Sequence, residues 1–307
     1  MQSFKLPLPN GATVAGIHNI PPVASSPHYR PLIVGLHGGS YDCHYFDANE
    51  EYTAAKQSTA LGVPFVAIDR PCYGGTTSFL PVPEDTDFTS ETGRWLHEHI
   101  LPALWTEFGV SNSCNCIVVL AHSLGVMGAT FAAALHAQDK TPAYPLGGII
   151  ASGLGDQFLS GGEEAPIRKP DVPPYHTLFP LDVKDQMMFR PGTVDPEILA
   201  CSESLNVPSP LADAESLSSV WAPKWREWAS HITAPVKFAL MEQDCFFVGT
   251  EEHVRSCVGA FVKSSRVDGS FVRGAPHCLE LSYWAPGWYA SCFGFALECA
   301  ASFAVRT

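Results

Sequence analysis

The segment 117–120 and the residues after it constrain the fold of this chain most. It reads IVVL, a short apolar run with three β-branched residues, which is typical of a strand buried on both faces of a parallel sheet. From residue 124 to 135, small residues recur at spacings of three and four, so one helix face can lie tightly on that sheet. One hydroxyl, that of Ser123, therefore falls at the predicted turn between strand and helix.

The residues around Ser123 form a recognisable pattern. Residues 121–125 read AHSLG, an A-x-S-x-G variant of the G-x-S-x-G nucleophile elbow. In an elbow, a strained turn points the serine Oγ out of the sheet, and the positions two before and two after must be small because strand and helix nearly touch. Ala121 meets this demand less freely than glycine would. An ordinary helix N-cap serine is the alternative interpretation.

Composition excludes several classes of protein. The 307 residues, 46% of them hydrophobic, are enough for a large single core or a core with one inserted subdomain. A net charge of -13 without clustered lysine or arginine argues against a nucleic-acid partner. We find no signal sequence and no apolar run near the roughly 18 residues of a membrane helix, so we expect a cytoplasmic protein with reduced thiols.

A metal or nucleotide site is not expected. The ten cysteines include one close pair, Cys114 and Cys116, without a second pair at zinc spacing. The glycines of the segment 153–155 lack the third glycine that a dinucleotide-binding motif requires. We therefore predict no metal and no cofactor.

Strand-like and helix-like segments alternate along most of the chain. Asn10-Gly11 predicts a hairpin with a two-residue turn between residues 4–8 and 12–17. Further strands are predicted at residues 32–36, 65–68, 117–120, 148–151, 236–240 and, more weakly, 270–272. Residues 91–108, with Pro102 as a kink, and residues 293–303 are predicted helices. This alternation predicts an α/β fold with a mainly parallel central sheet flanked by helices.

The alternation breaks between residues 156 and 230, which are rich in proline. A span this long without regular alternation is typical of a lid or binding element. We predict a mostly helical cap over residues 156–230, inserted into a core of residues 1–155 and 231–307. Trp221, Trp225 and Trp228 have the spacing of one helix face and favour a lid with an apolar underside, although they would equally anchor the lid to the body.

A glycine-rich turn follows the predicted strand at residues 32–36. In open parallel sheets, chemistry gathers outside the carboxyl ends of the strands, so this turn and Ser123 should share one edge. The turn reads His37-Gly38-Gly39-Ser40, and its N–H groups can face a cavity without a Cβ in the way. With the N–H of Leu124, the amide of Gly39, or less favourably Gly38, would form an oxyanion hole. A turn without this role is the alternative.

A serine nucleophile needs a base, and the chain offers twelve histidines. His277 is the candidate because it follows the last weak strand and precedes the C-terminal helix, in a loop that can reach Ser123. A solvated or capping loop histidine is the alternative. Five others are expected elsewhere: His97, His99 and His136 on helices facing solvent, His37 in the glycine turn and His122 directly before the serine.

The acid that orients the base should follow a late strand and precede His277. Asp244, after the predicted strand at residues 236–240, is the first choice, because its carboxylate would fix the imidazole tautomer and stabilise the imidazolium. Glu242 and Asp156 are the second and third candidates.

Together these motifs resemble the serine α/β-hydrolases over nearly the whole chain. The resemblance rests on the segments LHGG (36–39), DRPCYG (69–74), AHSLG (121–125), EQD (242–244) and PH (276–277). It implies a cap inserted after the sixth strand, no cofactor, and exclusion of the branches that use an aspartate nucleophile. Two positions depart from the usual pattern, Ala121 and Cys72, where relatives often have glycine.

We therefore predict hydrolysis of a carboxylic ester, lactone or thioester of a small, largely apolar molecule. Ser123 would attack the carbonyl and His277 would act as base. The candidate substrate-binding residues are Gly38, Ser40, His122, Met187, Met188, Phe189 and Trp221. C–C bond hydrolysis, or a lyase, acyltransferase or cyclisation step of natural-product metabolism, is the alternative, and a non-catalytic binding protein is less favoured. A homodimer is compatible with the sequence.

Overall fold

A central eight-stranded sheet organises the molecule. The computed structural model describes residues 1–23, 29–159 and 174–306. The strand order is β1-β2-β4-β3-β5-β6-β9-β10. The strands span β1 (Gln2–Pro7), β2 (Thr13–Asn19), β3 (Pro31–Leu36), β4 (Phe65–Ile68), β5 (Cys116–His122), β6 (Leu146–Ser152), β9 (Val236–Gln243) and β10 (Val267–Pro276). Strand β2 pairs antiparallel with β1 and β4, and all other neighbours are parallel. The predicted mainly parallel sheet is confirmed.

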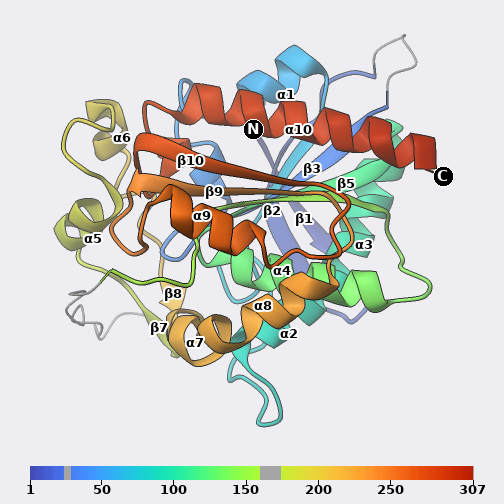
Figure 1. Cartoon of the computed structure of the whole chain (residues 1–307), viewed down its shortest axis with the longest axis horizontal. Coiled ribbons are helices and arrows are strands. Elements are labelled where there is room, and N and C mark those ends of the chain that lie inside the picture. The colour runs from blue at the N-terminus through green and yellow to red at the C-terminus, as the bar shows by residue number, and fades with distance from the viewer. Residues whose placement is uncertain (24–28, 160–173, 307) are drawn as a thin grey trace.

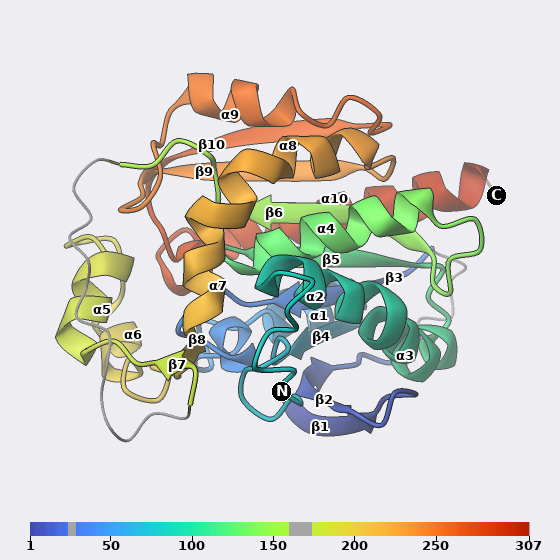
Figure 2. The same ribbon diagram turned by 90° about the horizontal axis from the view of Figure 1, so that it is seen from below.

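Helices cover both faces of this sheet (Figures 1 and 2). One face carries α1 (Ala55–Leu61) and the long α10 (Ala285–Arg306). The other carries α2 (Phe88–Trp95), α3 (Leu101–Leu104), α4 (Gly125–Gln138), α8 (Ala222–His231) and, beside β9 and β10, α9 (Glu251–Val258). Short 3-10 turns lie at Cys43–Phe46, Val110–Asn112 and Leu279–Leu281. The predicted arrangement of helices about a sheet is therefore confirmed.

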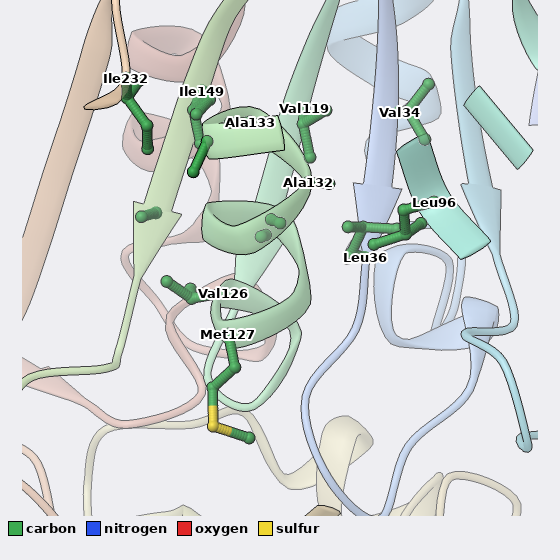
Figure 3. Packing of buried hydrophobic residues seen from close by; sticks show 14 of the residues in the cluster. Val34, Leu36, Leu96, Val119, Val126, Met127, Ala132, Ala133, Ile149 and Ile232 are labelled. Atoms are coloured by element: carbon green, nitrogen blue, oxygen red, sulfur yellow. The ribbon is translucent and has the colours of Figure 1, made fainter. Parts of the chain in front are cut away.

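The central strands β3, β4, β5 and β6 are buried on both faces, which explains their continuous apolar runs. Ile117 and Val119 of β5 belong to the core beneath α4, whereas Val118 and Leu120 belong to the core beneath α10. Figure 3 shows the first of these cores, where Val119 and the small residues Ala132 and Ala133 of α4 face each other. Small side chains on α4 thus allow the helix to lie close to the sheet, as expected from the sequence.

Several boundaries differ from the predicted ones. In the first hairpin the Leu8 N–H donates to the Ala12 carbonyl oxygen and the Gly11 N–H donates to the Leu8 carbonyl oxygen, so residues 9–11 form a three-residue loop and the predicted two-residue turn is wrong. The loop contains Pro9, which has no N–H to donate to a ladder. Strand β10 is longer than 270–272, and α10 begins at Ala285, well before 293. Two π-helical turns, Leu96–Ile100 and Trp105–Gly109, flank the segment with Pro102.

Helix α10 is an apolar segment of membrane-spanning length, which we did not expect from the sequence. In the described part of the chain, it alone is long and apolar enough to cross a membrane by length and composition, contrary to that expectation. It packs along the sheet, where Phe293 and Ala296 are fully buried. An apolar helix of this length therefore serves as a core helix here.

Part of the described chain between β6 and β9 lies beyond the carboxyl ends of the strands (Figure 2). Its described part contains α5 (Leu181–Met188), α6 (Pro196–Ala200), α7 (Leu211–Ser216), a π-helical turn (Leu217–Trp221), α8, and a two-stranded sheet of β7 (His176–Thr177) and β8 (Ser209–Pro210). The division into core and cap at residues 156 and 230 stays a prediction.

The three tryptophans of this insert are buried against the body. Trp221 and Trp225 stack at 5.2 Å between ring centroids, and Trp228 contacts Phe131 of α4. Trp221 Nε1 donates a hydrogen bond to the carbonyl oxygen of Gly155. The tryptophans therefore anchor the end of the insert to the body, which was the alternative to a lid underside.

Candidate active site

The turn between β5 and α4 has the geometry of a nucleophile elbow. Strand β5 ends at His122, α4 begins at Gly125, and Ser123 has a φ of +50°, in the left-handed region. A backbone hydrogen bond holds this strained turn, since the Ser123 N–H donates to the carbonyl oxygen of Ser152 at 2.8 Å. A Cβ at Gly125 would lie 2.6 Å from the carbonyl oxygen of His37 and 2.7 Å from that of Leu36. The close approach of strand and helix thus requires glycine at this position.

Ser123, His277 and Asp244 meet at the carboxyl edge of the sheet. Ser123 Oγ lies 3.0 Å from His277 Nε2, and His277 Nδ1 lies 2.8 Å from Asp244 Oδ2. All three residues are buried. The other oxygen of Asp244 accepts hydrogen bonds from the N–H groups of Phe246 and Phe247, which fix the carboxylate. Because Asp244 accepts from Nδ1–H, the Nε2 lone pair is free to accept the serine proton.

Glu242 and Asp156 lie in different surroundings. Glu242 is exposed and accepts a hydrogen bond from the Gly274 N–H. Asp156 is bound by His253 and Arg226, at 3.0 and 2.8 Å. Although burial opposes the shift, these hydrogen bonds lower the pKa of Asp156 to about 2. Among the three carboxylates considered, Asp244 is the one bonded to His277.

The remaining candidate histidines have partners away from Ser123 Oγ. His97 and His136 are half-buried against Tyr144, so the expectation that they are solvated is wrong. His122 is buried behind the elbow, where its Nδ1 lies 3.1 Å from Ser152 Oγ. Burial lowers the pKa of His122 well below its usual value, and the nearby His277 adds to the shift, so the ring is neutral.

Glu280 is a buried carboxyl that sequence reasoning missed. It accepts hydrogen bonds from the Tyr45 hydroxyl at 2.7 Å and the Trp288 indole at 2.8 Å, and lies 3.6 Å from His122 Nδ1. Burial raises its pKa. Its position three residues after His277 was the available signal, but one acid in an apolar segment reads equally as a surface residue.

The glycine turn lies directly against the elbow. A Cβ at Gly38 would be 3.0 Å from Ser123 Cβ, and a Cβ at Gly39 would be 2.8 Å from Leu124 Cδ1. The N–H groups of Gly39 and Leu124 donate to no acceptor among the described residues. Two unpaired amides beside a serine hydroxyl can bind the oxygen of a carbonyl that gains negative charge.

Ser123 and His277 open into a cavity of about 210 Å³. Five of the predicted substrate-binding residues line it: Gly38, Ser40, His122, Met187 and Met188. The remaining wall is largely apolar and includes residues that sequence reasoning missed: Phe179, Leu211, Ala214, Leu217, Phe246 and Phe247. Most of these come from the insert, where no periodic pattern signalled which side chains point inward.

Phe189 and Trp221 do not line this cavity, which corrects their predicted role. Phe189 is buried in the core that includes α10. Trp221 belongs to the core around α4 and is held by its bond to Gly155. An apolar side chain near the end of an element predicts burial but does not say on which side of the element the cavity lies.

Two described clusters have a geometry that could hold a metal ion, and neither lines the cavity. In the first, Asp42, Cys43 and His44, burial raises the pKa of the thiol. In the second, Asp156, His253 and Cys257, both ring nitrogens of His253 are engaged, with Val248 and Asp156. Burial raises the pKa of the Cys257 thiol to about 12.

A family model and several solved structures match this chain. A model of the alpha/beta hydrolase family matches residues 33–290. No curated protein matches the sequence. An esterase from Thermogutta terrifontis is 13% identical, with a TM-score of 0.60 over 98% of this chain and 100% of that one. The enol-lactonase from Burkholderia xenovorans LB400 is 14% identical, with a TM-score of 0.60 over 95% of this chain and 99% of that one. The thioesterase domain from the curacin biosynthetic pathway is 16% identical, with a TM-score of 0.54 over 97% and 99%. At these identities the likeness is one of fold.

Proposed function

This chain belongs to the alpha/beta hydrolase family, and from that premise we propose that it hydrolyses a carboxylic ester, lactone or thioester of a small, largely apolar molecule. One observation carries the proposal: Asp244 is hydrogen-bonded to His277, His277 is hydrogen-bonded to Ser123, and both Ser123 and His277 line an apolar cavity. A serine hydroxyl bonded to a buried, oriented imidazole is the arrangement that makes a weak nucleophile reactive.

Acylation follows from the positions of these side chains. Ser123 Oγ attacks the substrate carbonyl while its proton moves to His277 Nε2, and Asp244 stabilises the resulting imidazolium. The carbonyl oxygen gains negative charge and binds to the N–H groups of Gly39 and Leu124. When the tetrahedral intermediate collapses, His277 returns the proton to the leaving oxygen or sulfur. The acyl group stays on Ser123.

Deacylation repeats these steps with water as the nucleophile. His277 removes a proton from the water as it attacks the acyl carbon, and the same two amides bind the oxyanion. Collapse of the second intermediate releases the carboxylic acid and returns the proton to Ser123. In this proposal the insert at residues 156–230 acts as a cap over these steps, and α8 anchors it to α4.

The cavity walls support a small apolar acyl group. Phe179, Met187, Met188, Phe246 and Phe247 offer aromatic and thioether surface, and unbranched methionines adapt to ligands of different shape. Glu215 also lines the cavity and would disfavour an acyl group with a second carboxylate. The structural neighbours named as an esterase, an enol-lactonase and a thioesterase act at acyl carbons, which is consistent with this chemistry.

A series of p-nitrophenyl esters from acetate to decanoate tests the proposal. We expect hydrolysis with an optimum at short to medium chain length, because the cavity is only about 210 Å³. Ser123→Ala should abolish it. Reaction in ¹⁸O-labelled water should place one label in the released acid, whereas a lyase or cyclase would not incorporate it. Absence of turnover across the esters and thioesters in a folded protein would contradict the proposal.

A further inference from the structure

The peptide between Gly38 and Gly39 is held from the side opposite the elbow. Its carbonyl oxygen lies 2.7 Å from His37 Nδ1 and accepts a hydrogen bond from Arg70 Nη2 at 3.3 Å. In a trans peptide, the C=O and the following N–H point in opposite directions across a rigid plane. Two donors on the Gly38 oxygen therefore set the direction of the Gly39 N–H, one of the two amides assigned to the oxyanion hole.

The hydrogen bonds of His37 determine where its single proton sits. Burial, together with the positive charge of Arg70, lowers the pKa of His37 to about 3, so the ring is neutral. Its Nε2 accepts a hydrogen bond from the backbone N–H of Arg70 at 3.1 Å. The proton is therefore on Nδ1, where it can be donated to Gly38. Residue 70 thus acts on this peptide through both its side chain and its backbone.

Asp213, from helix α7 of the insert, holds the Arg70 guanidinium. Arg70 Nη2 lies 2.7 Å from Asp213 Oδ2, and each side chain is only 2% exposed. The same carboxylate oxygen accepts a hydrogen bond from the Tyr73 hydroxyl at 2.7 Å. A buried arginine without its carboxylate would be an uncompensated charge. Asp213 is therefore what allows Arg70 to stay charged beneath the glycine turn.

Helix α7 has a second connection to the site. Leu211 and Ala214, on either side of Asp213 in the sequence, line the cavity, while Arg70 and Asp213 do not. The helix that lines the cavity thus also carries Asp213, which holds Arg70 against the glycine turn. A shift of α7 would reach the Gly39 amide through two hydrogen bonds that Arg70 donates, one to Asp213 and one to the carbonyl oxygen of Gly38.

We propose that Arg70, held by Asp213, is a positioning residue that aims the Gly39 N–H at the developing oxyanion, so that the insert contributes to catalysis without touching the reacting atoms. This inference rests on the proposed hydrolase function. According to this inference, the buried ion pair of Arg70 and Asp213 couples the insert to the oxyanion hole.

Two substitutions test the assignment, Arg70→Met and Asp213→Asn. Arg70→Met removes the donor to Gly38, and we expect kcat to fall by about 10- to 100-fold, less than or similar to the loss of a whole oxyanion donor. KM should change by less than about threefold, because the support acts on the transition state more than on the bound ester. Asp213→Asn keeps the shape of the side chain but removes its charge, and kcat should fall by about tenfold.

A pair of inhibitors distinguishes positioning from a general loss of structure. A trifluoromethyl ketone forms a tetrahedral adduct with the serine and needs the oxyanion hole, whereas the matching methyl ketone binds without forming this charge. We expect the affinity for the trifluoromethyl ketone to fall in parallel with kcat and the affinity for the methyl ketone to stay within about twofold. Arg226→Met is the matched control, because Arg226 forms another Arg–Asp pair in the insert, with Asp156, away from the glycine turn.

The two proposals fail in different ways. Wild-type protein that neither turns over esters nor forms a ketone adduct overturns the hydrolase function. Active wild-type protein with a folded Asp213→Asn or Arg70→Met variant that keeps kcat and trifluoromethyl ketone affinity within twofold overturns the positioning role alone. Asp213→Asn replaces one oxygen by an NH₂ group, so this test remains available even if Arg70→Met does not fold.

Discussion

Replacing Asp244 by asparagine should lower kcat by about four orders of magnitude while the fold is kept. The neighbouring amides determine how the new side chain sits. Oδ1 accepts hydrogen bonds from the N–H groups of Phe246 and Phe247, at 2.8 and 3.1 Å, so the asparagine oxygen must stay there. Its NH₂ group then takes the place of Oδ2, which lies 2.8 Å from His277 Nδ1.

The tautomer of His277 determines the size of this effect. An NH₂ group can only donate, so Nδ1 must become the acceptor and the ring proton moves to Nε2. In that form Nε2 cannot accept the proton of Ser123, although the two atoms remain close to their 3.0 Å separation. Loss of the correct tautomer in a serine triad costs about 10⁴ in kcat. This corresponds to about 5.5 kcal/mol in the activation barrier.

Initial rates on the best p-nitrophenyl ester, with a thermal unfolding curve for each protein, measure this effect. Asp156→Asn is the matched control, since Asp156 also pairs with a histidine, His253, but outside the cavity. Its kcat should stay within about twofold of wild type. A folded Asp244→Asn protein with kcat within tenfold of wild type would show that Asp244 does not set the tautomer of His277.

Three further substitutions test the support of the site. Gly125→Ala should lower the melting temperature and the activity together, because its Cβ would lie 2.6 Å from a backbone oxygen, and unchanged melting would contradict this close approach. Trp221→Ala should lower the free energy of unfolding in urea by about 3–5 kcal/mol. KM should hardly change, since Trp221 packs in the core, and a large rise in KM would instead place it at the substrate. Lys184→Met removes an ammonium group whose pKa burial lowers from 10.5 to about 7, and which bonds to the carbonyl oxygens of Ser40 and Leu205. Between pH 7 and 10.5 the unfolded lysine binds a proton that the folded one does not. Wild type should therefore gain stability over the variant by roughly 1 kcal/mol per pH unit as pH rises from 7 to 10.5, and lose that gain as pH falls from 10.5 to 7, below which both states are protonated and the difference stays constant. A stability difference that is the same at pH 7 and pH 9 would contradict this.

The elbow could be predicted from sequence because its physical demands are local. A strand buried on both faces must be continuously apolar, and a helix that lies close to the sheet must carry small residues. Both patterns occur in the single segment 117–135. The order of serine, acid and histidine then narrowed the search to strand ends. His277 and Asp244 were chosen on that ground, and they are the two side chains that the structure brings into line with Ser123.

The insert could not be predicted in the same way, because its contacts are made with distant segments. Asp213 meets Arg70 across 143 positions in the chain, and Lys184 meets Ser40 across 144, and neither pairing leaves a periodic trace. The spacing of Trp221, Trp225 and Trp228 indicated one buried helix face. The same spacing fits a lid that covers a cavity and a helix that packs on the core. Only the three-dimensional structure shows which surface covers it.

Labelling with a fluorophosphonate probe tests whether Ser123 is an activated nucleophile. The probe forms a covalent bond with a serine that is activated by a neighbouring base, and mass spectrometry of the digested protein locates it. We expect one equivalent of label on the peptide that contains Ser123, no label on Ser123→Ala and strongly slowed labelling of His277→Ala. Folded wild-type protein that takes up no label, or takes it up on another residue, would show that Ser123 is not an activated nucleophile.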